Sequence, residues 1–313
     1  MKWLVTGGAG YIGSHVAHLL EEENNEVTVI DNLSSGLRNR LSGHTHFIEA
    51  DIRDERAIKK IFSDNRFEGV MHLAALKSPE ESVKNPEIYD QVNRLGTLNV
   101  ISNSAACGVN YLVQSSSSSI YGDASKNELA ETTFPQPISP YGKSKLDGEV
   151  ALNKSVESKL ILGTSLRFFN VVGSLKSNLQ DTSSFNLFPK VIRAIQSIQS
   201  PVIYGRKFDT RDGTCIRDYV HVGDVARAHL QVAKYLISGN DVPKALNIGT
   251  GRGSSVLEIV TEFLRQTDSS LAPRYEPPRE GDPGVVIANC NLAADSINFI
   301  SKFDLSNMVE SSF

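Results

Sequence analysis

The stretch Trp3-Leu-Val-Thr-Gly7-Gly-Ala-Gly10-Tyr-Ile-Gly13 joins a short apolar run to the start of an amphipathic pattern. This order predicts a strand, a tight glycine turn and a helix. The glycines allow the turn itself, the close approach of a pyrophosphate to the backbone, and packing of the helix on the strand. Spaced glycines also occur in ordinary turns, so the prediction of a dinucleotide site depends on the strand and helix around them.

Two carboxylates at the ends of later strands support this site. Asp31 ends the second expected strand, where it can accept hydrogen bonds from adenosine ribose hydroxyls. The same charge would repel a 2′-phosphate, so NAD is favoured over NADP. The alternative for Asp31 is a turn-forming residue before Asn32. Asp51 and Ile52 follow the third strand, where an acid commonly faces the adenine edge, and a helix cap is the alternative for Asp51.

A second pattern, Tyr141-Gly-Lys-Ser-Lys145, places a tyrosine and a lysine one helical turn apart on one face. An ammonium group this close favours the phenolate, so Tyr141 would act as a base closer to neutral pH than its ordinary pKa near ~10. The serine run Ser115–Ser119 is expected to follow the fifth strand directly, at the ligand-binding edge of the sheet. One of its hydroxyls would donate to a substrate oxygen near Tyr141. Each pattern alone also occurs on solvated helix faces and in polar loops, but together with the glycine turn they predict a nicotinamide-dependent enzyme.

Composition excludes several other classes of protein. The net charge of −4 comes from interspersed signs and gives no reason to expect nucleic-acid binding. Cys107, Cys215 and Cys290 are widely spaced and the histidines lack ligand spacing, so neither a disulfide framework nor a metal site is expected. Only four apolar residues precede the first glycines, and no run approaches the roughly 18 apolar residues of a membrane span. A soluble, cytoplasmic protein is expected.

The first half of the chain alternates short apolar runs with helical patterns, which is typical of a parallel sheet with crossover helices. Strands are expected at residues 2–6, 26–30, 45–49, 69–73, 111–114 and 161–168, and helices at 11–22, 56–64, 86–106 and 141–155. This pattern predicts an α/β fold with a Rossmann-type doubly wound parallel sheet. Its ligand crevice should lie at the carboxyl ends of the strands.

The rhythm changes after residue 169. At 313 residues the chain exceeds the usual size of a single core, so an NAD-binding domain of residues 1–169 and a smaller α/β domain of residues 170–313 are expected. The polar segment 170–184 leads into the second domain, and 218–250 is expected to pack back on the first. Further helices are expected at 185–197, 223–236 and 255–265, and strands at 202–204, 214–220 and 246–249. Asp224 is the expected cap of the second of these helices, and Ser254 or Ser255 that of the third. The proline-rich stretch 272–283 is expected to be a loop.

The chain resembles the extended short-chain dehydrogenase/reductase superfamily and, within it, the UDP-glucose 4-epimerase (UDP-galactose 4-epimerase) family. The likeness runs nearly end to end and includes the glycine turn and the Tyr141–Lys145 pattern. It also includes His72-Leu-Ala-Ala-Leu-Lys77, Ser117 with Tyr121-Gly122, Arg167-Phe-Phe-Asn170, Asp212-Gly-Thr-Cys-Ile-Arg-Asp-Tyr-Val-His-Val222, Asn247-Ile-Gly-Thr-Gly251 and Arg279-Glu-Gly-Asp282. These later motifs are more specific than the glycine turn, because Rossmann enzymes in general lack them.

The resemblance implies which residues bind each ligand. The NAD-binding set would be Gly7, Gly10, Tyr11, Ile12, Gly13, Asp31, Asn32, Asp51, Ile52, Leu73, Ala74, Ala75, Lys77, Asn93, Tyr141 and Lys145, with Lys77 near the pyrophosphate. The catalytic set would be Ser117, Tyr141 and Lys145. The UDP-sugar set would be Ser117, Tyr141, Asn170, Asn186, Leu187, Arg217 and Arg279, in which the two arginines suit a diphosphate by charge and fork geometry.

The resemblance also implies a reaction of carbohydrate metabolism. Tyr141 would take the proton of the sugar 4-OH while hydride passes from C4 to the nicotinamide, giving a 4-keto sugar. The keto sugar would then turn over, so that hydride returns to its opposite face. NAD is regenerated in each cycle and should remain tightly bound, and Lys145 would also bond the nicotinamide ribose.

Two positions depart from or refine the family pattern. Phe185 stands where the family often has the first of two asparagines, before Asn186. Val286, seven residues after Arg279, occupies the position that gates sugar size. A residue of this size leaves room for an N-acetylhexosamine, so UDP-GlcNAc and UDP-GalNAc are expected as further substrates.

Other functions remain open at this point. Another nucleotide-sugar epimerase, or a 4,6-dehydratase or decarboxylase on the same scaffold, is the nearest alternative. The dehydratases need an extra acid/base ahead of the Tyr-Gly pair, whereas this chain has Ser117-Ser-Ser-Ile120 there. A simple dehydrogenase would exchange its cofactor freely. A non-catalytic NAD-binding protein would typically lack the tyrosine or the lysine, and both are present. A homodimer is expected from the family alone, through the helices near 86–106 and 141–155.

Overall fold

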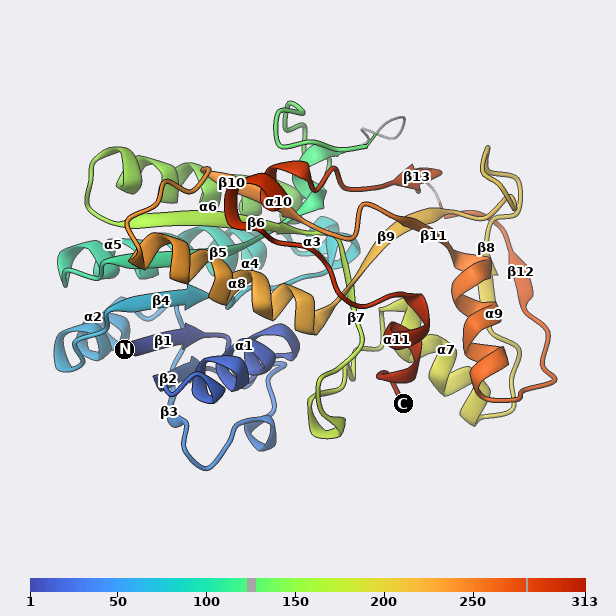
Figure 1. Cartoon of the computed structure of the whole chain (residues 1–313), viewed down its shortest axis with the longest axis horizontal. Helices are drawn as coiled ribbons and strands as arrows, with labels where there is room; N and C mark the ends of the chain where they lie inside the picture. The colour runs from blue at the N-terminus through green and yellow to red at the C-terminus, as the bar shows by residue number, and fades with distance from the viewer. Residues whose placement is uncertain (123–127, 280) are drawn as a thin grey trace.

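A seven-stranded sheet forms the centre of the larger part of the protein (Figure 1). The structure is a computed structural model and describes residues 1–122, 128–279 and 281–313. The strands are β1 (Lys2–Thr6), β2 (Glu26–Asp31), β3 (His46–Glu49), β4 (Gly69–His72), β5 (Tyr111–Ser117), β6 (Leu162–Phe168) and β10 (Ala245–Ile248). Their order is β10-β6-β5-β4-β1-β2-β3, and every pairing is parallel. The predicted doubly wound parallel sheet is therefore confirmed.

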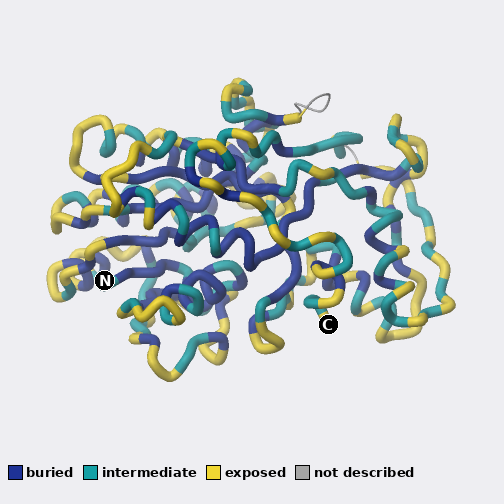
Figure 2. The backbone as a smooth tube through the Cα atoms, in the orientation of Figure 1, coloured by how far each residue is buried: buried dark blue, intermediate teal, exposed yellow. Residues whose placement is uncertain are grey.

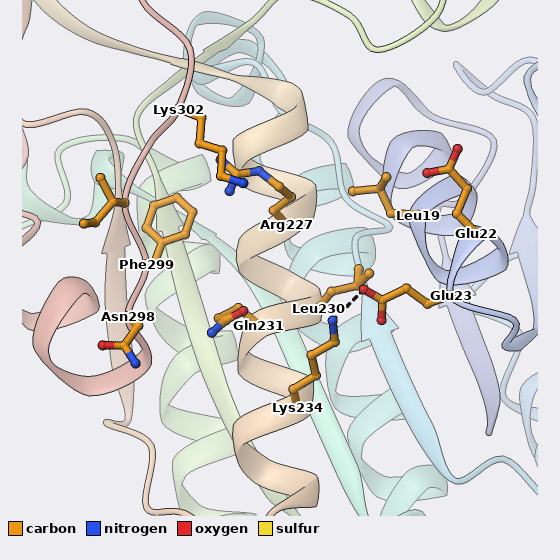
Figure 3. Close-up of a pocket in the computed structure, with 11 residues that line it drawn as sticks. Leu19, Glu22, Glu23, Arg227, Leu230, Gln231, Lys234, Asn298, Phe299 and Lys302 are labelled. Carbon is orange, nitrogen blue, oxygen red and sulfur yellow. Dashed lines mark hydrogen bonds and ion pairs between the residues drawn. The ribbon is translucent and has the colours of Figure 1, made fainter.

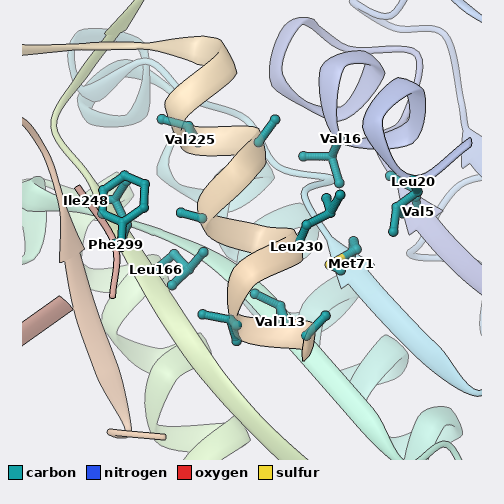
Figure 4. Packing of buried hydrophobic residues seen from close by; sticks show 14 of the residues in the cluster. Val5, Val16, Leu20, Met71, Val113, Leu166, Val225, Leu230, Ile248 and Phe299 are labelled. Atoms are coloured by element: carbon teal, nitrogen blue, oxygen red, sulfur yellow. The ribbon is translucent and has the colours of Figure 1, made fainter. Parts of the chain in front are cut away.

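Helices cover both faces of this sheet. One face carries α1 (Tyr11–Glu22), α8 (Val222–Ile237) and α10 (Asn291–Ile297), and the other carries α2 (Glu55–Asp64), α5 (Thr97–Ala106) and α6 (Pro140–Glu157). Successive strand residues point to opposite faces. In β1, Trp3 and Val5 pack with α1 and α8, whereas Leu4 packs with α2 and α5. The strands consequently run through the buried interior (Figure 2), and α8 lies against both α1 and the sheet (Figure 4).

A second, smaller part of the chain extends beyond the carboxyl ends of these strands. It contains a sheet of β7 (Asn170–Val172), β9 (Ile216–His221), β11 (Gly253–Ser255) and β13 (Val285–Val286), and a pair formed by β8 (Val202–Tyr204) and β12 (Arg274–Glu276). Its helices are α7 (Leu187–Gln196), α9 (Val256–Gln266) and α11 (Leu305–Glu310). Phe188, Tyr219 and Phe263 belong to a separate apolar core there. The chain returns from this part to the large sheet through α8 and β10.

The predicted helix at residues 86–106 is helical throughout but changes its winding. It consists of α4 (Pro86–Tyr89), a π-helical run η2 (Asp90–Gly96) and α5, and it is preceded by α3 (Pro79–Lys84). Within the described residues, no helix combines the length and apolar character needed to cross a membrane.

The serine run lies differently from the prediction. Ser115, Ser116 and Ser117 complete β5, where they pair with Leu166–Phe168 of β6 and are buried. Only Ser118 and Ser119 follow the strand, in a short helical turn η3 (Ser118–Tyr121). The prediction that the strand ends at Gln114 is wrong, because pairing with β6 satisfies the backbone of small polar residues that have weak strand propensity by themselves.

Two helix caps can be compared with their predictions. Ser255 caps α9 in a capping box with Glu258, as one of the two alternatives predicted. Asp224 does not cap α8: the cap is His221, whose ring accepts a hydrogen bond from the Gly223 amide. Asp224 instead lies buried within the first turn of α8, paired with Arg227 and accepting a hydrogen bond from the Lys302 amide.

A buried ion pair fixes α6 to the sheet. Arg167 of β6 donates two hydrogen bonds, of 3.0 and 2.7 Å, to the carboxylate of Glu149 on α6. The side chain of Glu149 is 3% exposed and that of Arg167 is 8% exposed. The Ser116 hydroxyl also donates to Glu149, at 2.5 Å. Glu149 was not among the predicted site residues, although it continues the four-residue spacing of Tyr141 and Lys145.

Four histidines are buried in the two cores and are neutral at pH 7. Burial lowers the pKa of His15 and His229 to about 4 and that of His72 and His221 to about 3. Unfolded histidine titrates near ~6.5. The unfolded chain therefore binds more protons than the folded chain below that pH, and these groups contribute stability that is present above pH ~6.5 and lost as the pH falls toward 4.

We expect the free energy of unfolding to fall between pH 7.5 and 5.5 by about 1 kcal/mol for each of these histidines. Urea unfolding at both pH values measures the change. An unfolding free energy that stays constant over this range would contradict the neutral, buried state of the four rings.

Candidate functional site

The glycine turn leaves room for a ligand at the N-terminus of α1. Gly7 has φ +68, and a Cβ there would lie 2.7 Å from the backbone of Ala74. A Cβ on Gly13 would lie 2.2 Å from the Gly7 carbonyl oxygen, so the helix packs directly on the turn. Gly10 is the N-cap and has no side chain to cap the helix, and the first turn contains no acidic residue. The free amides and the positive helix end therefore fit a pyrophosphate, which supports the predicted dinucleotide site.

Asp31 lies against this turn at the end of β2. Its carboxylate accepts hydrogen bonds from the amides of Ala9 and Leu33, at 3.0 and 2.8 Å. A Cβ on Gly36 would lie 2.7 Å from an Asp31 oxygen, so the following loop wraps closely around the carboxylate. Burial raises the pKa of Asp31, while the two amides lower it. The side chain both supports the glycine turn and borders the space next to it.

The next acidic position forms a small polar cluster. Asn32 donates a 2.8 Å hydrogen bond to Asp51, and Arg53 forms an ion pair of 2.7 Å with the same carboxylate. The hydrogen bond from Arg53 holds the pKa of Asp51 well below its usual range. The alternative interpretation of Asp51 as a helix cap is wrong, because Asp54 caps α2. Ile52 is buried.

Residues that follow β4 lie beside the glycine turn. Leu73 and Ala74 each donate a backbone hydrogen bond to the Thr6 hydroxyl, at 3.2 Å. Asn93 is 2% exposed, and its amide exchanges two hydrogen bonds with the backbone of Leu76. The amide of Asn93 thus braces the loop that carries Ala75 and Lys77.

The expected catalytic side chains are buried at the carboxyl end of β5 and the start of α6. Ser117, Tyr141 and Lys145 are each 8–9% exposed. The Lys145 ammonium donates to the carbonyl and the hydroxyl of Ser115, at 3.2 and 3.3 Å. The ring of Tyr141 makes an edge contact with Tyr89, with ring centroids 6.3 Å apart. The structure therefore brings together three groups from segments 24 residues apart in sequence.

Electrostatics in this set differ from the prediction. Burial raises the pKa of Tyr141, and hydrogen bonding with Ser117 lowers it in part. The predicted lowering of the Tyr141 pKa is wrong, because burial of the phenol raises this pKa. Burial also lowers the pKa of Lys145, to about 8, while Glu149 raises it. Lys145 is still protonated at neutral pH and can donate hydrogen bonds.

The expected UDP-sugar residues come from β7, α7, β9 and the loop before β13. Asn170 begins β7, and Asn186 and Leu187 begin α7. The Asn186 amide donates to Asp181, at 2.6 Å. Asp181 lies in the segment 170–184, which had no predicted role.

Both arginines of this set are held by neighbouring groups. Arg217 of β9 forms an ion pair of 2.5 Å with Asp282. Arg279 stacks over the ring of Tyr204 at 4.5 Å and lies 3.5 Å from Glu80. The Glu280 of the Arg279–Asp282 motif lies outside the described residues. Val286, the expected gate for sugar size, pairs with Arg217 in the register of β13 and β9.

Sequence reasoning missed a further cation in this region. Burial lowers the pKa of Lys190 of α7, and the nearby charge of Arg279 lowers it further. The positive charge of Arg279 therefore acts on Lys190. No motif marked Lys190, although its position on the helix opened by Asn186 could have pointed to it.

A cavity of about 550 Å³ lies between α1, α8 and residues 298–302, away from all of these side chains (Figure 3). Lys234 and Glu23 in its lining form an ion pair of 2.6 Å, and Arg227 of the lining pairs with Asp224 outside it. None of the residues predicted to bind NAD or sugar lines it. The glycine turn and the expected catalytic side chains lie instead at the carboxyl ends of β1 and β5.

The chain was compared with known proteins. Residues 3–249 match the NAD dependent epimerase/dehydratase family. The chain is 34% identical over 320 residues to a UDP-glucose 4-epimerase of Rhizobium leguminosarum bv. trifolii, which covers 99% of this chain and 95% of that protein.

Solved structures give the same result. A UDP-glucose-4-epimerase from Stenotrophomonas maltophila with bound NAD and formylated UDP-arabinopyranose superposes with a TM-score of 0.93 and 33% identity, covering 100% of this chain and 96% of that one. The UDP-Glc/GlcNAc 4-epimerase from Campylobacter jejuni gives 0.87 and 32%, with 100% and 98% coverage. By its sequence and its fold, this chain belongs to the NAD dependent epimerase/dehydratase family.

Proposed function

We propose that this protein is an isomerase, an NAD-dependent UDP-sugar 4-epimerase that interconverts UDP-galactose and UDP-glucose through a transient 4-keto sugar. The observation that carries this proposal is the buried set of Ser117, Tyr141 and Lys145 at the carboxyl end of β5, in the same parallel sheet as the glycine turn that follows β1. Relatives with the same fold are UDP-sugar 4-epimerases, and one of them was solved with NAD bound. A 4,6-dehydratase is not favoured, because Ser118, Ser119 and Ile120 of η3 supply no carboxylate beside Ser117.

The two parts of the chain would divide the binding. We assign NAD to residues 1–169 together with the 218–250 segment, and the UDP sugar to residues 170–313. This assignment is supported by β10, which completes the large sheet, and by α8, which packs on α1. NAD would be held by the amides at the start of α1, by Asp31 and by Lys77. Arg217 and Arg279 would hold the diphosphate of the sugar nucleotide.

The chain's own groups suggest how the proton moves. Tyr141 would accept the proton of the sugar 4-OH, with Ser117 donating a hydrogen bond to the same oxygen. Lys145, protonated below about pH 8, would keep positive charge near the phenolate. Bound NAD would accept hydride from C4 and return it. Base assistance of this kind accelerates a reaction by roughly 10²–10⁴-fold.

We expect the purified protein to convert UDP-galactose to UDP-glucose with no NAD added, because the cofactor is regenerated in each cycle. Proton NMR of the anomeric signals measures the conversion.

Tyr141→Phe should lower turnover at least ~100-fold while NAD stays bound. Unchanged turnover in that variant would exclude Tyr141 from the mechanism. A 4-keto-6-deoxy product, or one NADH released per substrate, would contradict the proposed reaction.

We also expect conversion of UDP-GalNAc, because Val286 is a side chain of moderate size at the sugar gate. Replacing Val286 by Tyr should lower kcat/KM for UDP-GalNAc by ~10-fold or more through steric exclusion. The same variant acting on UDP-galactose is the internal control and should be much less affected. Equal losses for both substrates would show that Val286 does not select sugar size.

We further propose a homodimer through the helical segment 86–106 (α4, η2 and α5) and α6, which pack against each other. Leu95 and Val150 on these helices are 46% and 45% exposed, although they are apolar. A second copy would remove these side chains from water.

Val150→Asp should therefore shift the protein toward a monomer, because a charge would be buried without a partner. Light scattering after size exclusion measures the mass. Ile198→Asp, at an apolar residue of the second part that is 83% exposed, is the matched control and should leave the mass unaltered. A wild-type protein that elutes as a monomer would refute the dimer.

A further inference from the structure

Asp181 lies between the residues proposed for NAD and those proposed for the UDP sugar. Its side chain is 10% exposed, and its Oδ1 is 3.9 Å from the Lys77 ammonium. Its Oδ2 accepts the 2.6 Å hydrogen bond from Asn186. The Ser183 amide donates to Oδ1 at 3.0 Å and fixes the rotation of the carboxylate. One carboxylate thus contacts a side chain on each side of the crevice.

Arg40 anchors the backbone around Asp181. It belongs to a short helical turn η1 (Arg38–Arg40), is 6% exposed, and donates to the Gln180 carbonyl at 2.8 Å and the Thr182 hydroxyl at 3.3 Å. These residues flank Asp181 in sequence. The same guanidinium reaches the Ala9 carbonyl of the glycine turn at 3.5 Å. Burial lowers the pKa of Arg40 and the charge of Asp181 raises it, so the two side chains interact electrostatically.

A second contact ties the same segment to the start of α1. The Tyr11 hydroxyl donates to the Gly173 carbonyl at 2.5 Å, and Tyr11 is buried. Residues 173–182 are therefore attached to the glycine turn at both ends, by Tyr11 and by Arg40. The segment that carries Asp181 is thus attached to the glycine turn, whereas its carboxylate accepts a hydrogen bond from Asn186, the N-cap of α7.

We propose that Asp181 is a positioning residue that couples the two subsites, an inference that rests on the proposed function. The carboxylate fixes Lys77 and Asn186 relative to each other. Occupation of one subsite then orders the side chain that serves the other. Because binding coupling is reciprocal, UDP bound beside Asn186 should slow the loss of NAD, and NAD should tighten the binding of UDP.

The absolute affinity for NAD would not isolate this role. Asp181→Asn keeps the shape of the side chain but removes the negative charge between Arg40 and Lys77. In this variant the unopposed positive charges of Arg40 and Lys77 would attract the pyrophosphate of NAD more strongly. The loss of the orientation of Lys77 would weaken NAD binding, so the two effects on affinity oppose each other. The ratio of NAD release rates with and without UDP cancels the first effect, since the charge change is present in both measurements.

The experiment follows NAD release from the purified holoenzyme after dilution, with and without UDP. In the wild-type protein UDP should slow release by ~5-fold or more. In Asp181→Asn the ratio should fall below ~2-fold, and the KM for UDP-galactose should rise while kcat changes little. Asp64→Asn, which removes an exposed carboxylate paired with Lys60 on α2, is the matched control and should keep the wild-type ratio.

Each outcome decides the inference. A wild-type ratio in Asp181→Asn, or no effect of UDP in the wild-type protein, would overturn it. Loss of thermal stability with the ratio intact would assign Asp181 a merely structural role and overturn it equally. If Asp181→Asn does not fold, Arg40→Lys, which cannot hold both residues that flank Asp181, must show the reduced ratio. The ratio of NAD release rates involves no turnover, so failure to convert UDP-galactose would refute the proposed function separately.

Discussion

The buried ion pair between Glu149 and Arg167 is the interaction on which the position of the site depends. Glu149 lies on the same face of α6 as Tyr141 and Lys145, because the three residues follow one another at intervals of four. Removing one partner of such a pair costs roughly 3–5 kcal/mol, since the other charge stays buried. The helix face that presents Tyr141 is therefore held to β6 by a contact two turns away, in addition to the hydrogen bonds of Lys145 to Ser115 of β5.

The ion pair also connects the two parts of the chain. Arg167 donates to the Tyr121 hydroxyl at 2.9 Å, and that hydroxyl donates to Asn247 of β10 at 2.7 Å. The amide of Asn247 in turn donates to the Leu129 carbonyl at 2.7 Å, beside the point where Leu129 bridges Ala288. A single buried network thus runs from α6 to the segment that follows β13.

Local sequence patterns predicted most of the large sheet and the glycine turn, because buried strands appear as short apolar runs and the turn appears as spaced glycines. Segments whose structure depends on distant partners were missed. β7 and β13 are short and exist through pairing with β9, and Ser115–Ser117 form strand through pairing with β6. Asp181 could not be predicted from spacing, because its contacts with Lys77 and Asn186 arise from the path of segment 173–186. The raised pKa of Tyr141 likewise follows from burial, which spacing alone does not give.

The position of β10 has a consequence for synthesis of the protein. β6 pairs on one side with β5 and on the other with β10, which the ribosome makes about 80 residues later. Until Leu246 and Ile248 emerge, both of them fully buried in the finished protein, β6 remains an open edge that can pair with another chain. The large sheet is thus complete only once β10 has been made, and during synthesis the edge of β6 is open to pairing with another chain.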